Sequence, residues 1–218
     1  MSKCLTGVPG RYNILIIGDS HAAALWWGFG QVFADANVMQ ATASGCKPVL
    51  HQRPRQHVGC SQIMSYVLND YLPAHRVDAL VIEAHWEEAD LPSIGETMAK
   101  LHELGVPTVL VGPIVQYDSS LPRLLALSIL QNDALLPHRH LEKYVKALDR
   151  QMSSLAQEQW HVRYVSLLDI LCAADSCTQY AAPGVPLQYD AAHLTRAGSI
   201  LTVQRIAETK IISADSRR

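Results

Sequence analysis

The fold is decided near the N-terminus by the stretch Tyr12-Asn13-Ile14-Leu15-Ile16-Ile17-Gly18-Asp19-Ser20-His21. Its apolar run, rich in branched residues, predicts a buried β-strand that ends at Gly18-Asp19-Ser20. An alanine-rich amphipathic segment follows at once over residues 21–33 and predicts a helix. Because open α/β sheets bind ligands at the carboxyl ends of their strands, Ser20 should lie at the functional edge of a sheet. Asp and Ser are also favoured helix N-caps, so the motif alone is more typical of a cap than of a nucleophile.

Further apolar runs alternate with segments of helical spacing along the rest of the chain. Strands are predicted at residues 38–41, 77–84, 108–113 and 162–165. Helices are predicted at residues 61–72, 91–104, 121–131, 140–159, 167–171 and 195–212, with Pro73 ending the first and Pro137 separating residues 121–131 from 140–159. Without an internal repeat or a linker, this alternation predicts one three-layer α/β/α domain over residues 1–218, ordered over about 12–212.

Composition and charge favour an ordinary globular domain and give no sign of a nucleic-acid-binding or membrane-spanning protein. Apolar residues make up 49% and charged residues 17% of the 218 residues, which is ordinary for a globular domain. The formal charge of −2, without a basic stripe, gives no reason to expect a nucleic-acid partner. No apolar stretch is long enough to cross a bilayer, and Met1-Ser2-Lys3-Cys4 lacks the apolar core of a signal peptide. A protein that works outside the cytoplasm would therefore need a targeting element upstream of this sequence.

The five cysteines leave two interpretations open. Cys46 and Cys60 bracket one short loop and Cys172 and Cys177 another, and disulfides commonly stabilise such loops in an oxidising compartment. Cys4 is then left over. The alternative is five reduced thiols in the cytosol. A metal site is not expected, because Cys-x-x-Cys is absent and the histidines near the cysteines lack ligand spacing.

A second motif stands near the C-terminus, where Asp190-Ala191-Ala192-His193-Leu194-Thr195 precedes the last helix. Taken alone, its Asp and His are typical of a helix start and a solvated side chain. Together with Gly18-Asp19-Ser20-His21, they resemble the SGNH (GDSL-like) hydrolase superfamily. Within it, the pair of motifs resembles the SGNH domain fused to membrane acyltransferases of the acyltransferase-three family, which O-acetylate bacterial surface polysaccharides. The resemblance covers residues 13–207.

The resemblance implies a flavodoxin-like five-stranded parallel sheet in the order 2-1-3-4-5 and a catalytic triad. Ser20 would be the nucleophile, His193 its base, and Asp190 the carboxylate that fixes the imidazole tautomer. Gly45, whose simpler interpretation is a turn glycine, would join the backbone N–H of Ser20 in an oxyanion hole.

One motif departs from the superfamily. Hydrolytic members carry Gly-x-Asn-Asp after the third strand, where this chain has His85-Trp86-Glu87-Glu88. The usual Asn donor is therefore missing. His85 and Trp86 are candidates for lining the pocket, since an imidazole or an indole N–H can donate a hydrogen bond. His21, characteristic of the acyltransferase-fused group, is a third candidate, either packed under the site or touching the acceptor. A packed Trp and a surface His are the simpler interpretations.

The expected function is acyl transfer. The resemblance implies an O-acetyltransferase domain, the C-terminal part of a larger membrane acyltransferase, periplasmic and tethered to the inner membrane. It implies no bound cofactor: a membrane domain would deliver an acetyl group derived from acetyl-CoA, and the acceptor would be a polysaccharide such as the lipopolysaccharide O-antigen. The alternatives are a free-standing esterase or deacetylase with the same triad and, from another class, a glycan-binding module without catalysis.

Overall fold

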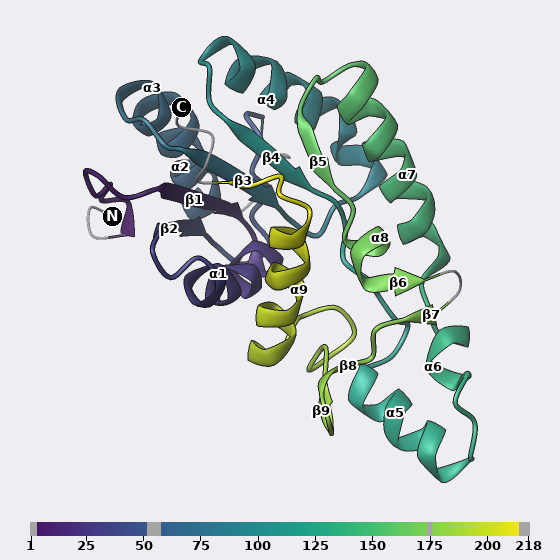
Figure 1. Ribbon diagram of the computed structural model, residues 1–218. Coiled ribbons are helices and arrows are strands. Elements are labelled where there is room, and N and C mark those ends of the chain that lie inside the picture. Colours follow the sequence, from purple (N-terminus) through teal and green to yellow (C-terminus); the bar gives the residue numbers. More distant parts are fainter. Residues whose placement is uncertain (1–3, 52–57, 174–175, 214–218) are drawn as a thin grey trace.

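A computed structural model describes residues 4–51, 58–173 and 176–213 (Figure 1). Its centre is a sheet of five parallel strands in the order β2-β1-β3-β4-β5. The strands are β1 (Asn13–Gly18), β2 (Asn37–Thr42), β3 (Ala79–Glu83), β4 (Thr108–Val111) and β5 (Arg163–Val165). The predicted strand order is therefore confirmed. Because all five strands are parallel, their carboxyl ends meet at one edge of the sheet, where β1 and β3 pair up to Gly18 and Glu83.

Helices cover both faces of the sheet (Figure 1). They are α1 (Ser20–Val32), α2 (Val58–Ser65), α3 (Leu72–Ala74), α4 (Leu91–Glu103), α5 (Leu121–Leu130), α6 (Leu136–Arg139), α7 (Lys143–Glu158), α8 (Leu167–Leu171) and α9 (Arg196–Glu208). A π-helix η2 (Tyr66–Tyr71) joins α2 to α3, and a 3₁₀ turn η3 (Glu88–Asp90) precedes α4. No helix in the described ranges is long and apolar enough to cross a membrane.

Alternate residues of β1 divide the core into two layers. Ile14 and Ile16 pack with α1 and α9 on one face, and Leu15 and Ile17 pack with α2, α4 and α7 on the other. All four side chains are fully buried, as expected for a central parallel strand covered on both faces. The three-layer α/β/α prediction is thus confirmed.

Both expected disulfide pairs are bonded in the structure, Cys46 to Cys60 and Cys172 to Cys177. The second links the paired strands β6 (Cys172–Ala173) and β7 (Ser176–Cys177). A second small hairpin, β8 (Tyr180–Ala182) with β9 (Val185–Pro186), follows before the Asp190–His193 segment. Cys4 is exposed and outside these bonds.

One of the two prolines does not end a helix where the sequence pattern predicted. Pro73 lies inside the helical segment, which continues to Ala74. The wider π-helical turn before it pairs Leu72 N–H with the carbonyl of Val67, five residues back, and such a turn accommodates a residue that has no N–H of its own. Pro137 separates α5 from α7 as predicted, and it does so within the first turn of the short helix α6, a position that suits proline.

Helix α7 also begins later than predicted. It starts at Lys143 instead of residue 140, because the preceding segment pairs with the loop after β4. Leu141 forms an antiparallel bridge with Tyr117, and Glu142 N–H donates to the Gln116 carbonyl.

Helices α1 and α9 lie side by side and make an unusually close backbone contact (Figure 1). Gly28 of α1 faces the backbone of Ser199 in α9, and a Cβ at position 28 would lie 2.4 Å from the Ser199 carbonyl oxygen. The Ser199 hydroxyl accepts from Gly28 N–H at 2.8 Å and donates to the Ala24 carbonyl at 2.5 Å. The contact therefore requires a residue without a side chain at position 28.

Two substitutions in α1 should consequently change stability in opposite directions. Gly28→Ala should lower the free energy of unfolding by about 1–3 kcal/mol, because the new methyl group collides with α9 backbone. Gly30→Ala meets nothing within 4 Å and should raise it by about 0.5–1 kcal/mol through helix propensity. Urea unfolding followed by circular dichroism measures both. Equal effects at the two positions would contradict the close contact.

Candidate active site

The turn between β1 and α1 presents Ser20 at the sheet edge. Gly18 ends β1 with φ of +146°, and a Cβ there would lie 1.7 Å from the Glu83 carbonyl oxygen of β3. Only glycine fits this approach. Asp19 then caps α1: one carboxylate oxygen accepts from His21 N–H and the other from His85 N–H, both at 2.9 Å. The Asp19 side chain thus fastens the turn to the chain leaving β3, and Ser20 is left half-buried at the first position of α1.

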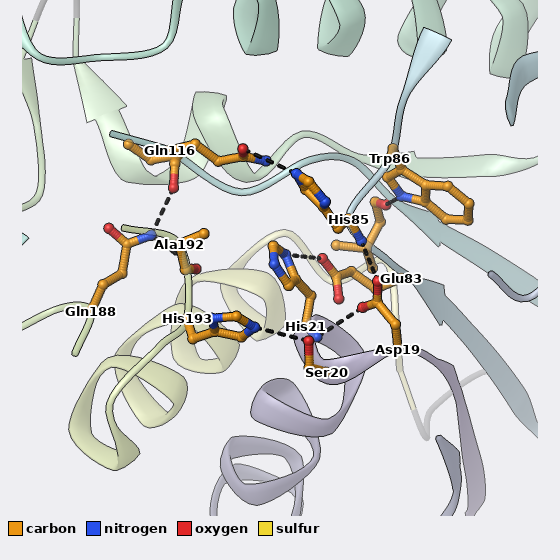
Figure 2. A network of polar contacts seen from close by, with 12 residues as sticks. Asp19, Ser20, His21, Glu83, His85, Trp86, Gln116, Gln188, Ala192 and His193 are labelled. Atoms are coloured by element: carbon orange, nitrogen blue, oxygen red, sulfur yellow. Dashed lines mark hydrogen bonds and ion pairs between the residues drawn. The ribbon is translucent and has the colours of Figure 1, made fainter. Parts of the chain in front are cut away.

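The Asp190–His193 segment brings its imidazole to the serine hydroxyl. Ser20 Oγ lies 2.8 Å from His193 Nε2 (Figure 2). On the other side of the ring, His193 Nδ1 lies 2.8 Å from Asp190 Oδ2. The other oxygen of Asp190 accepts from Ala192 N–H at 2.9 Å and His193 N–H at 2.7 Å. One carboxylate therefore both closes the turn and holds the ring so that Nδ1 carries the proton and Nε2 can accept from the serine.

The same turn sets the charge of Asp190. Burial alone would raise the pKa of its carboxyl, but the backbone N–H groups of Ala192 and His193 and the His193 ring lower it, and the net pKa is below the ordinary value. Asp190 consequently stays ionised near neutral pH, as an orienting carboxylate requires.

Hydrogen bonds from the neighbouring loops fix this segment in place. The amide of Gln188, fully buried, donates to the carbonyls of Val115 at 2.7 Å and Ala192 at 3.1 Å. Tyr117 N–H donates to the Ala191 carbonyl at 3.0 Å. The segment is thus held against the loop after β4, and its position does not depend on solvent-exposed contacts alone.

A buried acid and a histidine lie behind the triad. His21 is 6% exposed and Glu83 is 1% exposed, and His21 Nδ1 lies 3.6 Å from a Glu83 carboxylate oxygen (Figure 2). The His21 ring also stands edge-on to the His193 ring, with 4.9 Å between centroids. Burial raises the pKa of Glu83 to about 7. Burial alone would lower the pKa of His21, but the Glu83 carboxylate opposes this and the net pKa is raised.

His85 lies beside His21 and connects the buried His21–Glu83 pair to Gln116, in the loop after β4. Its ring lies 5.3 Å from that of His21 and its Nε2 lies 3.2 Å from Gln116 Oε1, which also accepts from the Tyr144 hydroxyl at 2.7 Å. Burial and the charges of His21 and Lys47 lower the pKa of His85, which favours the neutral ring. Within the described part of the chain, no group of three or more His, Cys, Asp or Glu side chains is placed to hold a metal ion.

Trp86 does not line the pocket as suggested. Its side chain is fully buried in the layer on the α4 and α7 side, and its indole N–H donates to the Val111 carbonyl at 2.9 Å (Figure 2). The strand end turns this side chain inwards, so its N–H is not available to an oxyanion.

Gly45 follows the end of β2, which pairs with β1 up to Gly18 and Thr42. Its φ of +64° is that of a turn glycine. It therefore lies along the same sheet edge as Ser20, and its part in an oxyanion hole stays a prediction.

Sequence reasoning did not single out Glu83, Gln116 or Gln188 as functional. Glu83 had a signal, because a carboxylate inside an otherwise apolar buried strand is rarely there without a reason. Gln116 and Gln188 had none. A glutamine in a loop is ordinary, and the partners of each come from elsewhere in the chain: side chains of His85 and Tyr144 for Gln116, and backbone carbonyls of Val115 and Ala192 for Gln188.

A family model described as the SGNH domain fused to AT3 domains matches residues 2–208. The chain belongs to this family. A search of curated proteins found no match.

Solved structures share the fold. The periplasmic domain of a lipopolysaccharide acetyltransferase from Salmonella ser. Paratyphi A is 20% identical, with a TM-score of 0.80 over 95% of this chain and 86% of that one. A putative SGNH hydrolase from Slackia heliotrinireducens is 17% identical, with a TM-score of 0.52 over 92% and 100%. A carbohydrate acetylesterase family member from Sinorhizobium meliloti is 12% identical, with a TM-score of 0.51 over 91% and 97%.

The buried Glu83 of this SGNH domain should make stability depend on pH. The folded state keeps the Glu83 proton up to about pH 7, whereas the unfolded chain releases it near the ordinary value of 4.5. Its contribution to stability is therefore present at low pH and lost as pH rises from 4.5 to about 7. Glu83→Gln removes this titration, so the variant should gain stability relative to wild type over that range.

Urea unfolding at about pH 5 and about pH 8 measures whether the stability of Glu83→Gln relative to wild type rises with pH, as expected. Glu96→Gln is the control, because Glu96 is an exposed carboxylate on α4. A constant difference in unfolding free energy between Glu83→Gln and wild type at the two pH values would contradict the buried titration.

Proposed function

We propose that this SGNH domain is an O-acetyltransferase that passes an acetyl group through Ser20 to a hydroxyl of a bacterial surface polysaccharide, such as the O-antigen of lipopolysaccharide. The observation that carries the proposal is the chain of hydrogen bonds from Ser20 Oγ through the His193 ring to Asp190, in which each donor–acceptor distance is 2.8 Å. Such a hydrogen-bonded Ser-His-Asp arrangement activates a serine hydroxyl that is otherwise a weak nucleophile near neutral pH.

In the first half-reaction, Ser20 Oγ attacks the carbonyl carbon of the acetyl donor while His193 Nε2 takes the hydroxyl proton. Asp190 stabilises the imidazolium that forms. The backbone N–H groups of Ser20 and Gly45 are the proposed donors to the tetrahedral oxyanion. The intermediate then collapses: the bond to the donor's leaving group breaks, His193 returns its proton to that group, and acetyl-Ser20 remains.

In the second half-reaction, a sugar hydroxyl takes the place of the leaving group. Its oxygen attacks the acetyl carbonyl while His193 Nε2 takes its proton. Collapse breaks the bond to Ser20 Oγ, which regains a proton from His193, and releases the acetylated sugar. No net oxidation occurs, and each proton removed by His193 is returned.

Transfer rather than hydrolysis is supported by the end of β3. The Asn donor of the hydrolytic superfamily members is absent, and the Trp86 indole that stands there donates to Val111 instead. An oxyanion hole with fewer donors slows attack on acetyl-Ser20 by water and by a sugar hydroxyl alike, so the intermediate lives longer, and a glycan hydroxyl bound beside it can then react before water does. Losing one donor typically costs about 10²- to 10³-fold in rate.

The setting of the reaction is proposed from the family and the disulfides. The family's domain is fused to AT3 domains, and the similar Salmonella domain is periplasmic. Two disulfides suit that oxidising compartment. These observations support our proposal that the domain works in the periplasm, tethered to the inner membrane by an acyltransferase domain that delivers acetyl groups derived from acetyl-CoA.

Nitrophenol release from p-nitrophenyl acetate, with and without O-polysaccharide, tests the proposal when acetyl on the glycan is measured alongside. Release should be slow and should fall by about 10³- to 10⁴-fold in Ser20→Ala and Asp190→Asn, because nucleophile and tautomer are lost. Acetyl should appear on the glycan with wild type and with the control variant, but not with Ser20→Ala or Asp190→Asn. The matched control is Asp118→Asn, which removes the carboxylate from another Asp–His pair, with His140 at 2.7 Å.

Each contrary outcome points to a different class of protein. Fast release that ignores the glycan would replace the transferase by an esterase. Equal release by wild type and Ser20→Ala, with no acetyl on the glycan, would contradict acyl transfer through the serine and favour a glycan-binding module.

A further inference from the structure

Each member of the Ser20–His193 pair has an exposed aromatic side chain on its own side: one ring beside His193, and one on the helix that Ser20 begins. On the first side, Tyr189 directly precedes Asp190 and is 60% exposed. Its ring is nearly parallel to that of His193, with 5.7 Å between centroids and 16° between planes. Tyr189 N–H also donates to the His193 carbonyl at 2.9 Å, so the turn holds the Tyr189 backbone beside the catalytic segment. A large, solvent-facing ring therefore stands next to the proposed base.

On the second side, Trp27 of α1 is 37% exposed and lies seven residues after Ser20. That spacing is two helical turns, so Trp27 lies on the same face of the helix as Ser20, about 10 Å along its axis. The positions between them on this face are Ala23 and Ala24. Their small side chains do not protrude between Ser20 and Trp27.

Helix α9 completes this second side. Arg196, its first residue, is exposed and places its guanidinium carbon 4.7 Å from the centroid of the Trp27 ring. The cation over the indole face holds both side chains in place. Arg196 follows His193 by three residues and Trp27 follows Ser20 by seven, so the stacked pair links α1 and α9, the two helices that lie side by side in Figure 1.

We propose that Tyr189 and the Trp27–Arg196 pair form an acceptor subsite that binds sugar rings of the glycan next to the Ser20–His193 pair. The inference rests on the proposed function and deepens it by assigning residues to the acceptor. An exposed aromatic face is apolar with a polar edge, which matches the C–H face of a pyranose surrounded by hydroxyls. The guanidinium supplies several donors for those hydroxyls. Trp, Tyr and Arg are also the side chains that most often dominate binding energy at interfaces.

Binding should be measured in the Ser20→Ala background, where no acyl transfer can occur, by calorimetric titration with alkali-deacylated O-polysaccharide of Salmonella ser. Paratyphi A as the probe. Trp27→Ala and Tyr189→Ala should each raise the dissociation constant by roughly tenfold or more. Trp27→Phe and Tyr189→Phe keep an aromatic face and should restore most of the affinity. The rescue separates ring stacking from a folding defect.

The chain offers two matched controls. Trp26 is the neighbouring indole with the same 37% exposure, but its N–H bonds the Val38 carbonyl of β2 on another flank of α1. Tyr180, 40% exposed, lies on the β8 hairpin. Trp26→Ala and Tyr180→Ala should change the dissociation constant by less than about twofold. In steady-state transfer, Trp27→Ala should raise the KM for the glycan more than it lowers kcat.

The failures of the subsite and of the proposed function are distinguishable. Glycan binding that is absent in the Ser20→Ala protein, or equal in Trp27→Ala and Trp26→Ala, overturns the subsite even if wild type shows Ser20-dependent ester turnover. Binding that depends on Trp27 and Tyr189 supports the subsite even if wild type shows no Ser20-dependent turnover. In that case only the proposal of acyl transfer through Ser20 is contradicted.

Discussion

The close approach of α1 and α9 is the contact on which the site geometry depends. Ser20 opens α1 and His193 stands just before α9, so the packing of two helices sets the distance between groups 173 residues apart. Gly28 permits the contact and the Ser199 hydroxyl fixes it by bonding two backbone groups of α1. Since a misplacement of about 1 Å can cost a hundredfold in rate, a backbone-to-backbone contact is a suitable support for a triad.

Ser20 lies between two environments of opposite character. Behind it, Asp19, His21 and Glu83 form a buried ionisable layer, and the edge-on contact of His21 with His193 joins that layer to the triad. In front, the surface is exposed and carries aromatic rings. The proposed transfer to a bulky acceptor such as a polysaccharide agrees with this arrangement, because an open face leaves room that a closed pocket would not.

The sequence predicts what local patterns determine, and it falls short where partners come from elsewhere in the chain. Runs such as 14–17 predict strands, and parallel pairing then predicts that Ser20 and the segment after β3 share an edge. The direction of a side chain at a strand end is different: Trp86 turns inwards because the Val111 carbonyl of β4 offers an acceptor, which no local pattern contains. Pro73 likewise stays helical because a π-helical turn precedes it, and the spacing of apolar residues does not reveal that turn.

The most direct measurement is intact-protein mass spectrometry after brief exposure to p-nitrophenyl acetate and acid quenching, followed by peptide mapping. If Ser20 carries the acetyl group, one added acetyl group should be found on the peptide that contains Ser20, and none on Ser20→Ala. Added O-polysaccharide should remove this acetyl group faster than buffer does. An acetyl group that persists in Ser20→Ala, or that is found only on other residues, would contradict Ser20 as the acyl carrier.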